Sequence, residues 1–259
     1  MNKPYVGVTG AATEEQVNGC VSILTKYFSP DDAHMPMLGI LVSYKTLEQG
    51  RHLSKKEFPP LDMVSSLLGT AEGRLWTTIH YNTKKRHFMA DEVSSVFDMD
   101  DIYESNLCRA VQLNVIWPYQ EGINKIKDRY PEMKIILSLS GAATKGMTID
   151  QIVENTASYS GIDYVLIDPS MGFGKDFEID CSLKLYNALK NSGVTACIGF
   201  AGGLSGENAR EKVLQIRKRL NSDDFCIDAQ GRLRDENDEF DLEKVRHYAE
   251  EAWHALTDS

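Results

Sequence analysis

The sequence lacks both a long apolar run and an excess of basic residues. No stretch of its 259 residues approaches the roughly 20 apolar residues that a membrane-spanning helix needs. The N-terminus also lacks the basic-then-apolar order of a secretory signal. Because 28 Lys and Arg stand against 38 Asp and Glu, the net charge is −10, which argues against the broad basic surface that nucleic acid or an anionic membrane selects. We therefore expect a cytoplasmic protein with no nucleic-acid partner and no membrane partner.

Cysteine is scarce and scattered. The five cysteines are odd in number and never stand at the C-x2-C spacing that gathers thiolates on one metal. Cys197 and Cys226 lie in apolar runs typical of strands, and we interpret them as buried, reduced thiols rather than catalytic groups. The cysteines therefore predict no metal site.

Eight short apolar runs alternate with stretches that carry helix signals. The runs are rich in β-branched residues and are often bounded by Gly, Pro, Asn or Ser, as strands are. They cover Pro4–Val8, Met37–Ser43, Leu75–Tyr81, Arg109–Ile116, Met133–Leu139, Asp163–Asp168, Val194–Phe200 and Asp224–Asp228. Such strands, alternating with helices, form a parallel sheet buried on both faces. Eight units in this length predict an α/β fold with a single domain, a (β/α)8 TIM barrel over residues 1–259.

The helix signals differ in strength along the chain. Thr13, Thr148 and Ser205 are the clearest candidates for helix N-caps. Two connections are weaker, since Tyr44–Pro60 is long and polar and Thr83–Leu107 has only patchy helical character. Connections of this length in a compact domain are usually functional lids or mobile segments.

Glycine turns follow the seventh and eighth expected strands. A barrel of this kind builds its active site from loops at the carboxyl ends of the strands and commonly holds phosphate after strands 7 and 8. Gly202 and Gly203 permit close backbone approach just before a helix N-terminus, which attracts anions. Gly231 and Arg232 can add amides and a guanidinium to the same phosphate. We interpret the two turns as a phosphate site; the alternative is that each is only a turn.

An aspartate ends the sixth expected strand. Asp168 should point into the open end of the barrel, where a partly desolvated carboxylate can act as general acid or base. The alternative is an aspartate that merely caps the following turn. The loop after it, Gly172–Lys175, lacks the G-x4-G-K-[ST] spacing of a nucleotide P-loop.

Together these turns resemble phosphoribosylanthranilate isomerase, a tryptophan-pathway barrel enzyme of the ribulose-phosphate-binding group. That family has a strand ending in Asp, a Gly-x-Gly-Lys loop, a Gly-Gly-Leu-x-x-x-Asn turn and an Asp-x-x-Gly turn. The matching residues are Asp168, Gly172–Lys175, Gly202-Gly203-Leu204 with Asn208, and Asp228 with Gly231; Val6-Gly7-Val8-Thr9 and Val111-Gln112-Leu113 match more loosely. The resemblance implies that Asp168 is the general acid that opens the ribose ring and that the glycine turns hold the phosphate.

Departures from the family pattern fall on the chemistry. The family's catalytic cysteine, which acts as base, aligns with Val6, so we expect poor or no phosphoribosylanthranilate isomerase activity. His80 is the best-placed substitute because imidazole titrates near neutral pH, although an outward or core histidine is the alternative. The family's strand-4 histidine aligns with Asn114. Its strand-2 arginine, which receives the anthranilate carboxylate, has no clear match, with Arg51 or Lys45 as candidates.

The sequence thus predicts an isomerase-type enzyme that acts on a phosphorylated sugar-like metabolite by acid–base catalysis, with no metal or organic cofactor. The expected catalytic residues are Asp168 and His80. Contacts to the rest of the substrate are assigned to Arg51, Asn114 and Lys175. The alternative is a catalytically silent barrel that binds a phosphometabolite or serves as an assembly partner. An aldolase or lyase is disfavoured, because no lysine stands on the sixth strand for a Schiff base.

Overall fold

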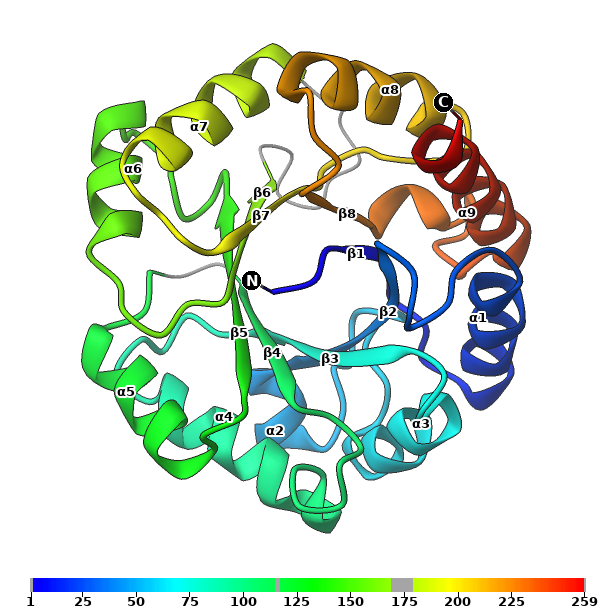
Figure 1. Cartoon of the computed structure of the whole chain (residues 1–259). Coiled ribbons are helices and arrows are strands. Elements are labelled where there is room, and N and C mark those ends of the chain that lie inside the picture. The colour runs from blue at the N-terminus through cyan, green and yellow to red at the C-terminus, as the bar shows by residue number, and fades with distance from the viewer. Residues whose placement is uncertain (1, 115–116, 169–178, 259) are drawn as a thin grey trace.

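The computed structural model describes residues 2–114, 117–168 and 179–258. Eight parallel strands form a closed barrel, in which each strand pairs with the next along the chain and the last pairs with the first. The strands are β1 (Tyr5–Thr9), β2 (Met35–Ser43), β3 (Trp76–Asn82), β4 (Ala110–Asn114), β5 (Lys134–Ser140), β6 (Tyr164–Asp168), β7 (Cys197–Phe200) and β8 (Cys226–Ala229). Figure 1 shows the helices as a ring around them. The predicted (β/α)8 barrel is confirmed.

Helical structure follows every strand and returns the chain to the start of the next one. The helices are α1 (Glu14–Tyr27), α2 (Tyr44–Gln49), α3 (Val64–Ala71), α4 (Met89–Asp98), α5 (Gln120–Arg129), α6 (Ile149–Ala157), α7 (Ile179–Asn191), α8 (Ala209–Leu220) and α9 (Leu242–Thr257), with 3-10 turns η1 (Leu61–Met63), η2 (Met99–Asp101) and η3 (Gly231–Leu233). Within the described ranges, none of them is long and apolar enough to cross a membrane.

Two of the three predicted N-caps are confirmed. Thr13 accepts a hydrogen bond from an amide in the first turn of α1, and Thr148 does the same at α6. Ser205 does not cap a helix, because α8 begins three residues later than that cap requires, after Asn208. The Asn208 side chain instead accepts from the Ser205 amide at 2.9 Å and donates to the Gly203 carbonyl at 2.8 Å. It therefore braces the turn that precedes the helix.

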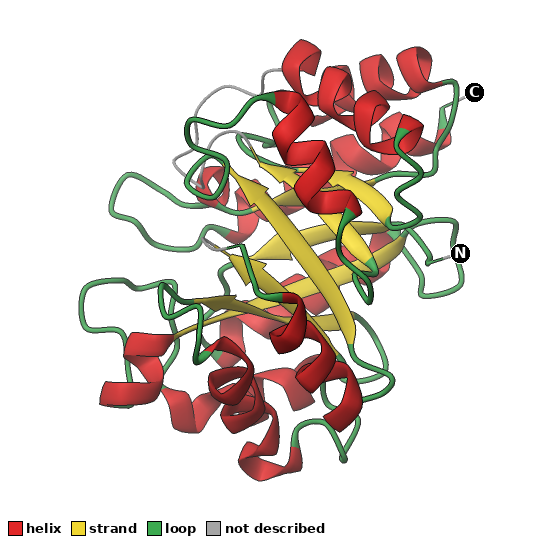
Figure 2. Cartoon of the chain, turned by 90° about the vertical axis from the view of Figure 1, so that its left-hand side faces the viewer, coloured by secondary structure: helices red, strands yellow, loops and turns green. Residues whose placement is uncertain are grey.

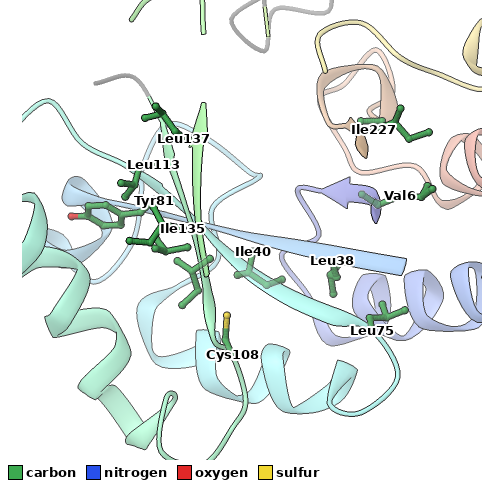
Figure 3. Close-up of a cluster of buried hydrophobic side chains, with 14 of the residues drawn as sticks. Val6, Leu38, Ile40, Leu75, Tyr81, Cys108, Leu113, Ile135, Leu137 and Ile227 are labelled. Carbon is green, nitrogen blue, oxygen red and sulfur yellow. The ribbon is translucent and has the colours of Figure 1, made fainter. Parts of the chain in front are cut away.

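Alternate residues of each strand face opposite sides of the barrel wall. The outward residues pack against the helices in one large buried cluster, part of which Figure 3 draws. Inward residues toward the amino-terminal end of the strands form a second cluster. In it, the ring centroids of Tyr5, Trp76 and Tyr164 lie 5.3 to 5.6 Å apart. These three residues begin β1, β3 and β6, so aromatic rings fill the amino-terminal end of the interior.

The two strand cysteines belong to the inward cluster. Cys197 and Cys226 are buried and reduced, with their sulfur atoms 3.6 Å apart. Burial raises the pKa of the Cys226 thiol well above its ordinary value. The interpretation of both as buried, reduced thiols is confirmed.

The beginning and the end of the barrel are joined by three sets of contacts. β1 pairs with β8 in the wall. Outside the wall, α1 contacts α9, where the rings of Tyr27 and Trp253 lie 6.1 Å apart. The connection Tyr44–Pro60 contains α2 and then reaches the loop after β8, where Gln230 donates to Glu57 at 3.0 Å. This long connection therefore fastens the β2 side of the open end to the β8 side.

Candidate functional site

The carboxyl ends of the strands, here called the mouth, lie on the side away from the N-terminus in Figure 2. Six strands end there in a polar residue on the inward face. These residues are Thr9 of β1, Ser43 of β2, Asn82 of β3, Asn114 of β4, Ser140 of β5 and Asp168 of β6. A polar side chain buried without a hydrogen-bond partner destabilises the folded chain, so such groups are usually paired or bind a ligand. The mouth is therefore the candidate site, as expected for a barrel of this kind.

β1 places no thiol or other base at the mouth. Val6 is fully buried among the outward residues, beside Ile227 of β8 (Figure 3). Gly7 and Thr9 face inward, and a β-carbon added to Gly7 would lie 2.7 Å from Oδ1 of Asp228. The alignment of Val6 with the family's catalytic cysteine therefore does not put residue 6 in the site. A cysteine at this position would face the helices.

A second inward glycine gives room to two polar side chains. A β-carbon on Gly39 would lie 2.5 Å from Oγ1 of Thr9 and 2.6 Å from Nε2 of His80. The Thr9 hydroxyl is 3.2 Å from Oδ1 of Asp228 and 3.5 Å from Nδ1 of His80. Missing side chains at positions 7 and 39 thus let three polar groups meet inside the barrel.

Asp228 is a buried carboxyl group with only 4% of its surface exposed. Burial raises its pKa to about 7; the hydrogen bond with Thr9 opposes this rise, and the negative charge of Asp168 adds to it. A carboxyl group that changes protonation near neutral pH can both release and accept a proton there. In the sequence, Asp228 was only a match to a turn motif, and its raised pKa was not predicted.

His80 points into the barrel and is fully buried. Burial lowers its pKa to about 3, so the imidazole is neutral at physiological pH. Its Nε2 atom has no hydrogen-bond partner among the described residues. A group with so low a pKa is a weak base at neutral pH. The structure therefore favours a supporting role for His80 behind Thr9 over the role of general base.

Asp168 ends β6 and is partly exposed at the mouth. The negative charge of Asp168 raises the pKa of Asp228, so the two carboxyl groups are close enough to interact electrostatically. Two neighbouring carboxyl groups in different environments are a common arrangement for acid–base chemistry. The predicted Gly172–Lys175 loop, with Lys175, lies outside the described residues.

The turn after β7 has the geometry expected of an anion site. Gly202 and Gly203 have φ values of 91° and 92°, which other residues rarely adopt. Within the described part of the chain, no hydrogen bond uses the amides of Gly202 or Gly203, and the buried hydroxyl of Ser205 has no partner. Ser205 was expected only as a helix cap. Its unpaired hydroxyl beside free amides adds a further donor to this turn.

The second predicted turn lies next to the first, because β7 and β8 are paired neighbours. Gly231 and Arg232 form η3 directly after β8, and the Arg232 side chain is partly exposed. The structure thus brings all four predicted phosphate-binding residues to adjacent strand ends.

Amide side chains occupy the opposite part of the mouth. Gln112 donates to Asn114 at 2.9 Å, and these residues pair in register with His80 and Asn82 of β3. Among the described residues, Oε1 of Gln112 and Oδ1 of Asn82 have no partner. Unpaired amide oxygens in a polar mouth suit hydroxyl groups of a ligand. Asn114, predicted to contact substrate, belongs to this group.

A basic cavity of about 220 Å³ lies after β2 and β3. Its cationic lining residues are Lys45, Lys55 and Lys84, and His52 and the acidic Glu57 also line it. Partial burial and the charges of Lys45 and Lys55 lower the pKa of His52. Arg51 is not part of this cavity; it lines a separate groove with Met99 and Asp100. Of the two candidates for the missing strand-2 arginine, the structure therefore brings Lys45 to the mouth side.

The fold and these strand ends define a class of protein: a (β/α)8 barrel whose mouth combines carboxyl groups with a glycine turn. Across residues 2–114, 117–168 and 179–258, no group of three or more His, Cys, Asp or Glu is arranged to hold a metal ion. No family model matches the sequence, and no curated protein matches it.

Solved structures of phosphoribosylanthranilate isomerase are similar to this chain. The Thermotoga maritima enzyme has a TM-score of 0.65 at 14% identity, over 96% of this chain and 98% of that chain. The Thermus thermophilus enzyme has a TM-score of 0.62 at 14% identity, over 95% and 97%. A complex of the isomerase with reduced 1-(o-carboxyphenylamino)-1-deoxyribulose 5-phosphate has a TM-score of 0.63 at 13% identity, over 96% and 98%. The resemblance in the sequence is thus confirmed at the level of the fold.

Proposed function

We propose that the protein is an isomerase-type enzyme, similar to phosphoribosylanthranilate isomerase, that acts on a phosphorylated sugar-like metabolite by acid–base catalysis. The observation that carries the proposal is the order of the strand ends. β7, which carries the glycine turn, lies between β6 and β8, which carry Asp168 and Asp228. A phosphate held at the turn would therefore bring the adjoining carbon atoms between two carboxyl groups.

Each part of the mouth has a task in such a reaction. Isomerisation of a sugar requires one group to protonate an oxygen and another to take a proton from carbon. We assign Asp168 to the first step, in line with the resemblance. The amides of Gly202 and Gly203 hold the phosphate and fix the orientation of the reacting carbons. The amide side chains of Asn82 and Asn114 face the hydroxyl groups, and the basic cavity beside Lys45 accepts a second polar or anionic end.

A catalytically silent phosphate-binding barrel is the second candidate. The observation that favours it is the inward face of β1, where Gly7 and Thr9 provide no ionisable group. In that case the barrel would bind the same phosphorylated ligands without converting them.

The two candidates differ in a direct assay. Purified protein is incubated with phosphoribosylanthranilate, and the gene is tested for complementation of a strain that lacks the isomerase. Turnover that depends on Asp168 supports the enzyme. Reduced 1-(o-carboxyphenylamino)-1-deoxyribulose 5-phosphate, here called the reduced product analogue, serves as the ligand in a binding assay. Binding of this analogue without any turnover supports the silent barrel. The absence of both turnover and binding contradicts the proposed phosphate recognition.

The variant Ser205→Ala tests the phosphate turn without disturbing the fold. The Ser205 hydroxyl has no partner among the described residues, so its removal should leave the free energy of unfolding nearly unchanged. We expect affinity for the reduced product analogue to fall about tenfold to 150-fold, because a hydrogen bond to a charged group contributes about 1.5–3 kcal/mol. Calorimetric titration measures this change.

Ser182→Ala is the matched control, because Ser182 in α7 is also buried with no hydroxyl partner among the described residues. Its analogue affinity should equal that of the wild type. An equal loss in both variants, or no loss in Ser205→Ala, would place the phosphate elsewhere.

A further inference from the structure

We propose that Asp228 is the proton-transfer partner of Asp168 in this barrel, and that Thr9 with His80 behind it sets the ionisation of Asp228. This inference rests on the proposed function and names the base that the sequence leaves unassigned. It assigns a catalytic role to Asp228 and positioning roles to Thr9 and His80.

The location of the Asp228 carboxyl group is the first argument. Oδ1 of Asp228 lies 2.7 Å from the point where a β-carbon on Gly7 would stand. The carboxyl group, together with the terminal methyl group of Met37 at 2.6 Å, thus fills the space that an inward side chain of β1 would occupy. Since β1 offers no base of its own, the acid–base group at this place in the mouth comes from β8.

The hydrogen-bond chain is the second argument. The Thr9 hydroxyl has one proton and lies between Asp228 at 3.2 Å and His80 at 3.5 Å. When Asp228 is ionised, Thr9 donates to it, and His80 must then donate from Nδ1. When Asp228 is protonated, it donates to Thr9, and Thr9 can donate to His80. Each protonation state of Asp228 therefore has a matching arrangement of the same three groups.

The surroundings of Asp228 leave it free to change charge. The titratable groups near it are Asp168 on β6, Tyr5 on β1 and Tyr248 on α9, with His80 reached through Thr9. Burial raises the pKa values of both tyrosines and lowers that of His80, so these three are neutral around pH 7. Among the residues that the structure describes, none of the groups that act on Asp228 is a cation. A buried carboxyl group without a cationic partner is typical of functional sites and costly elsewhere.

The proton balance of the step is complete within the site. Ionised Asp228 takes a proton from a substrate carbon next to a C=O or C=N group, and the electron pair of that C–H bond forms a carbon–carbon double bond. The π electron pair of the C=O or C=N group moves onto its oxygen or nitrogen, to which Asp168 gives its proton. The reverse transfers restore both carboxyl groups after the product forms, so no oxidant or reductant is required.

The test uses four variants of the full chain: Asp228→Asn, Asp228→Glu, Thr9→Val and Thr9→Ser. With phosphoribosylanthranilate as the probe, we expect Asp228→Asn to lower kcat by about 10²- to 10⁴-fold. Asp228→Glu should keep part of the rate. Thr9→Val removes the hydrogen bond to the carboxylate and so raises the pKa of the base, which should move the acidic limb of the kcat profile to higher pH. Thr9→Ser should keep the wild-type profile.

A titration by NMR of carboxyl-labelled aspartate in the free protein measures Asp228 without any turnover. We expect a resonance that titrates near pH 7 in the wild type, disappears in Asp228→Asn and moves to higher pH in Thr9→Val. Titration near pH 4, or a full wild-type rate in Asp228→Asn, overturns the assignment while leaving the proposed function intact. A wild type that turns over neither phosphoribosylanthranilate nor any other phosphorylated sugar tested overturns the proposed function. In that case an Asp228 resonance that does not respond to the reduced product analogue overturns the assignment as well.

Discussion

Replacement of Asp168 by asparagine is expected to reduce kcat/KM for a phosphorylated sugar substrate by about 10²- to 10⁴-fold, the usual cost of removing a general acid or base. The side chain ends β6 inside the mouth, beside the glycine turn of β7. Asparagine has nearly the same shape and cannot transfer a proton. Affinity for the reduced product analogue should therefore change far less than the rate, and steady-state kinetics with calorimetric titration separates the two.

Asp163→Asn provides the matched control, because Asp163 lies at the other end of the same strand. Its carboxylate pairs with Lys127 at 2.7 Å and with Lys134 at 3.1 Å, far from the mouth. We expect this variant to lose stability and to keep its kcat. If Asp168→Asn behaves in the same way, Asp168 is a structural residue and the silent barrel is the better account.

The variant Asp228→Asn is expected to abolish the loss of stability that the wild type undergoes as pH rises from 4 to 8. The pKa of Asp228 rises from its ordinary 3.8 to about 7 in the folded chain, mainly through burial. Between these two values the native state holds a proton that the unfolded chain has released, so the free energy of unfolding falls as pH rises through this window. At about 1.4 kcal/mol for each pKa unit, the wild type loses roughly 4 kcal/mol between pH 4 and pH 8.

Asparagine cannot ionise, so this loss should be absent from the variant. We expect Asp228→Asn and the wild type to have similar urea midpoints near pH 4, with the variant clearly more stable at pH 8. His80 acts with the opposite sign in both proteins, since its pKa of about 3 in the folded chain makes acid destabilising below pH 6.5. Equal midpoints for the two proteins at pH 8 would show that Asp228 is ionised without penalty.

The strands were predictable because their signal is local. All eight expected runs overlap the observed strands, and the largest shift is at β7, which begins at Cys197 rather than Val194. The direction of each side chain was not predictable in the same way. A strand buried on both faces is apolar at every position, so no alternation shows which residues face inward. Val6 and Gly7 therefore could not be told apart as site positions, although both lie in one short motif.

The glycine turns were predictable because the order of strands in a barrel fixes which ends are neighbours. The pairing of Asp228 with Thr9 and His80 was not, because it depends on space created by Gly7 and Gly39 on other strands. No spacing along the chain encodes this contact. The unpaired hydroxyl of Ser205 was hidden for a similar reason, since serine before a helix is normally a cap.

The pairing of β1 with β8 has a consequence for the way this chain folds. These strands lie at opposite ends of the sequence, so the barrel cannot close until its last unit has been synthesised. Contacts of such long sequence separation slow folding, because the entropy of closing the whole chain is lost before they form. Until then the growing chain presents unpaired strand edges, which favour aggregation. The last segment to be synthesised runs from β8 through α9; it pairs with the open edge of β1 and packs against α1. Once this segment has been made, the nascent chain can close its barrel and becomes resistant to self-association.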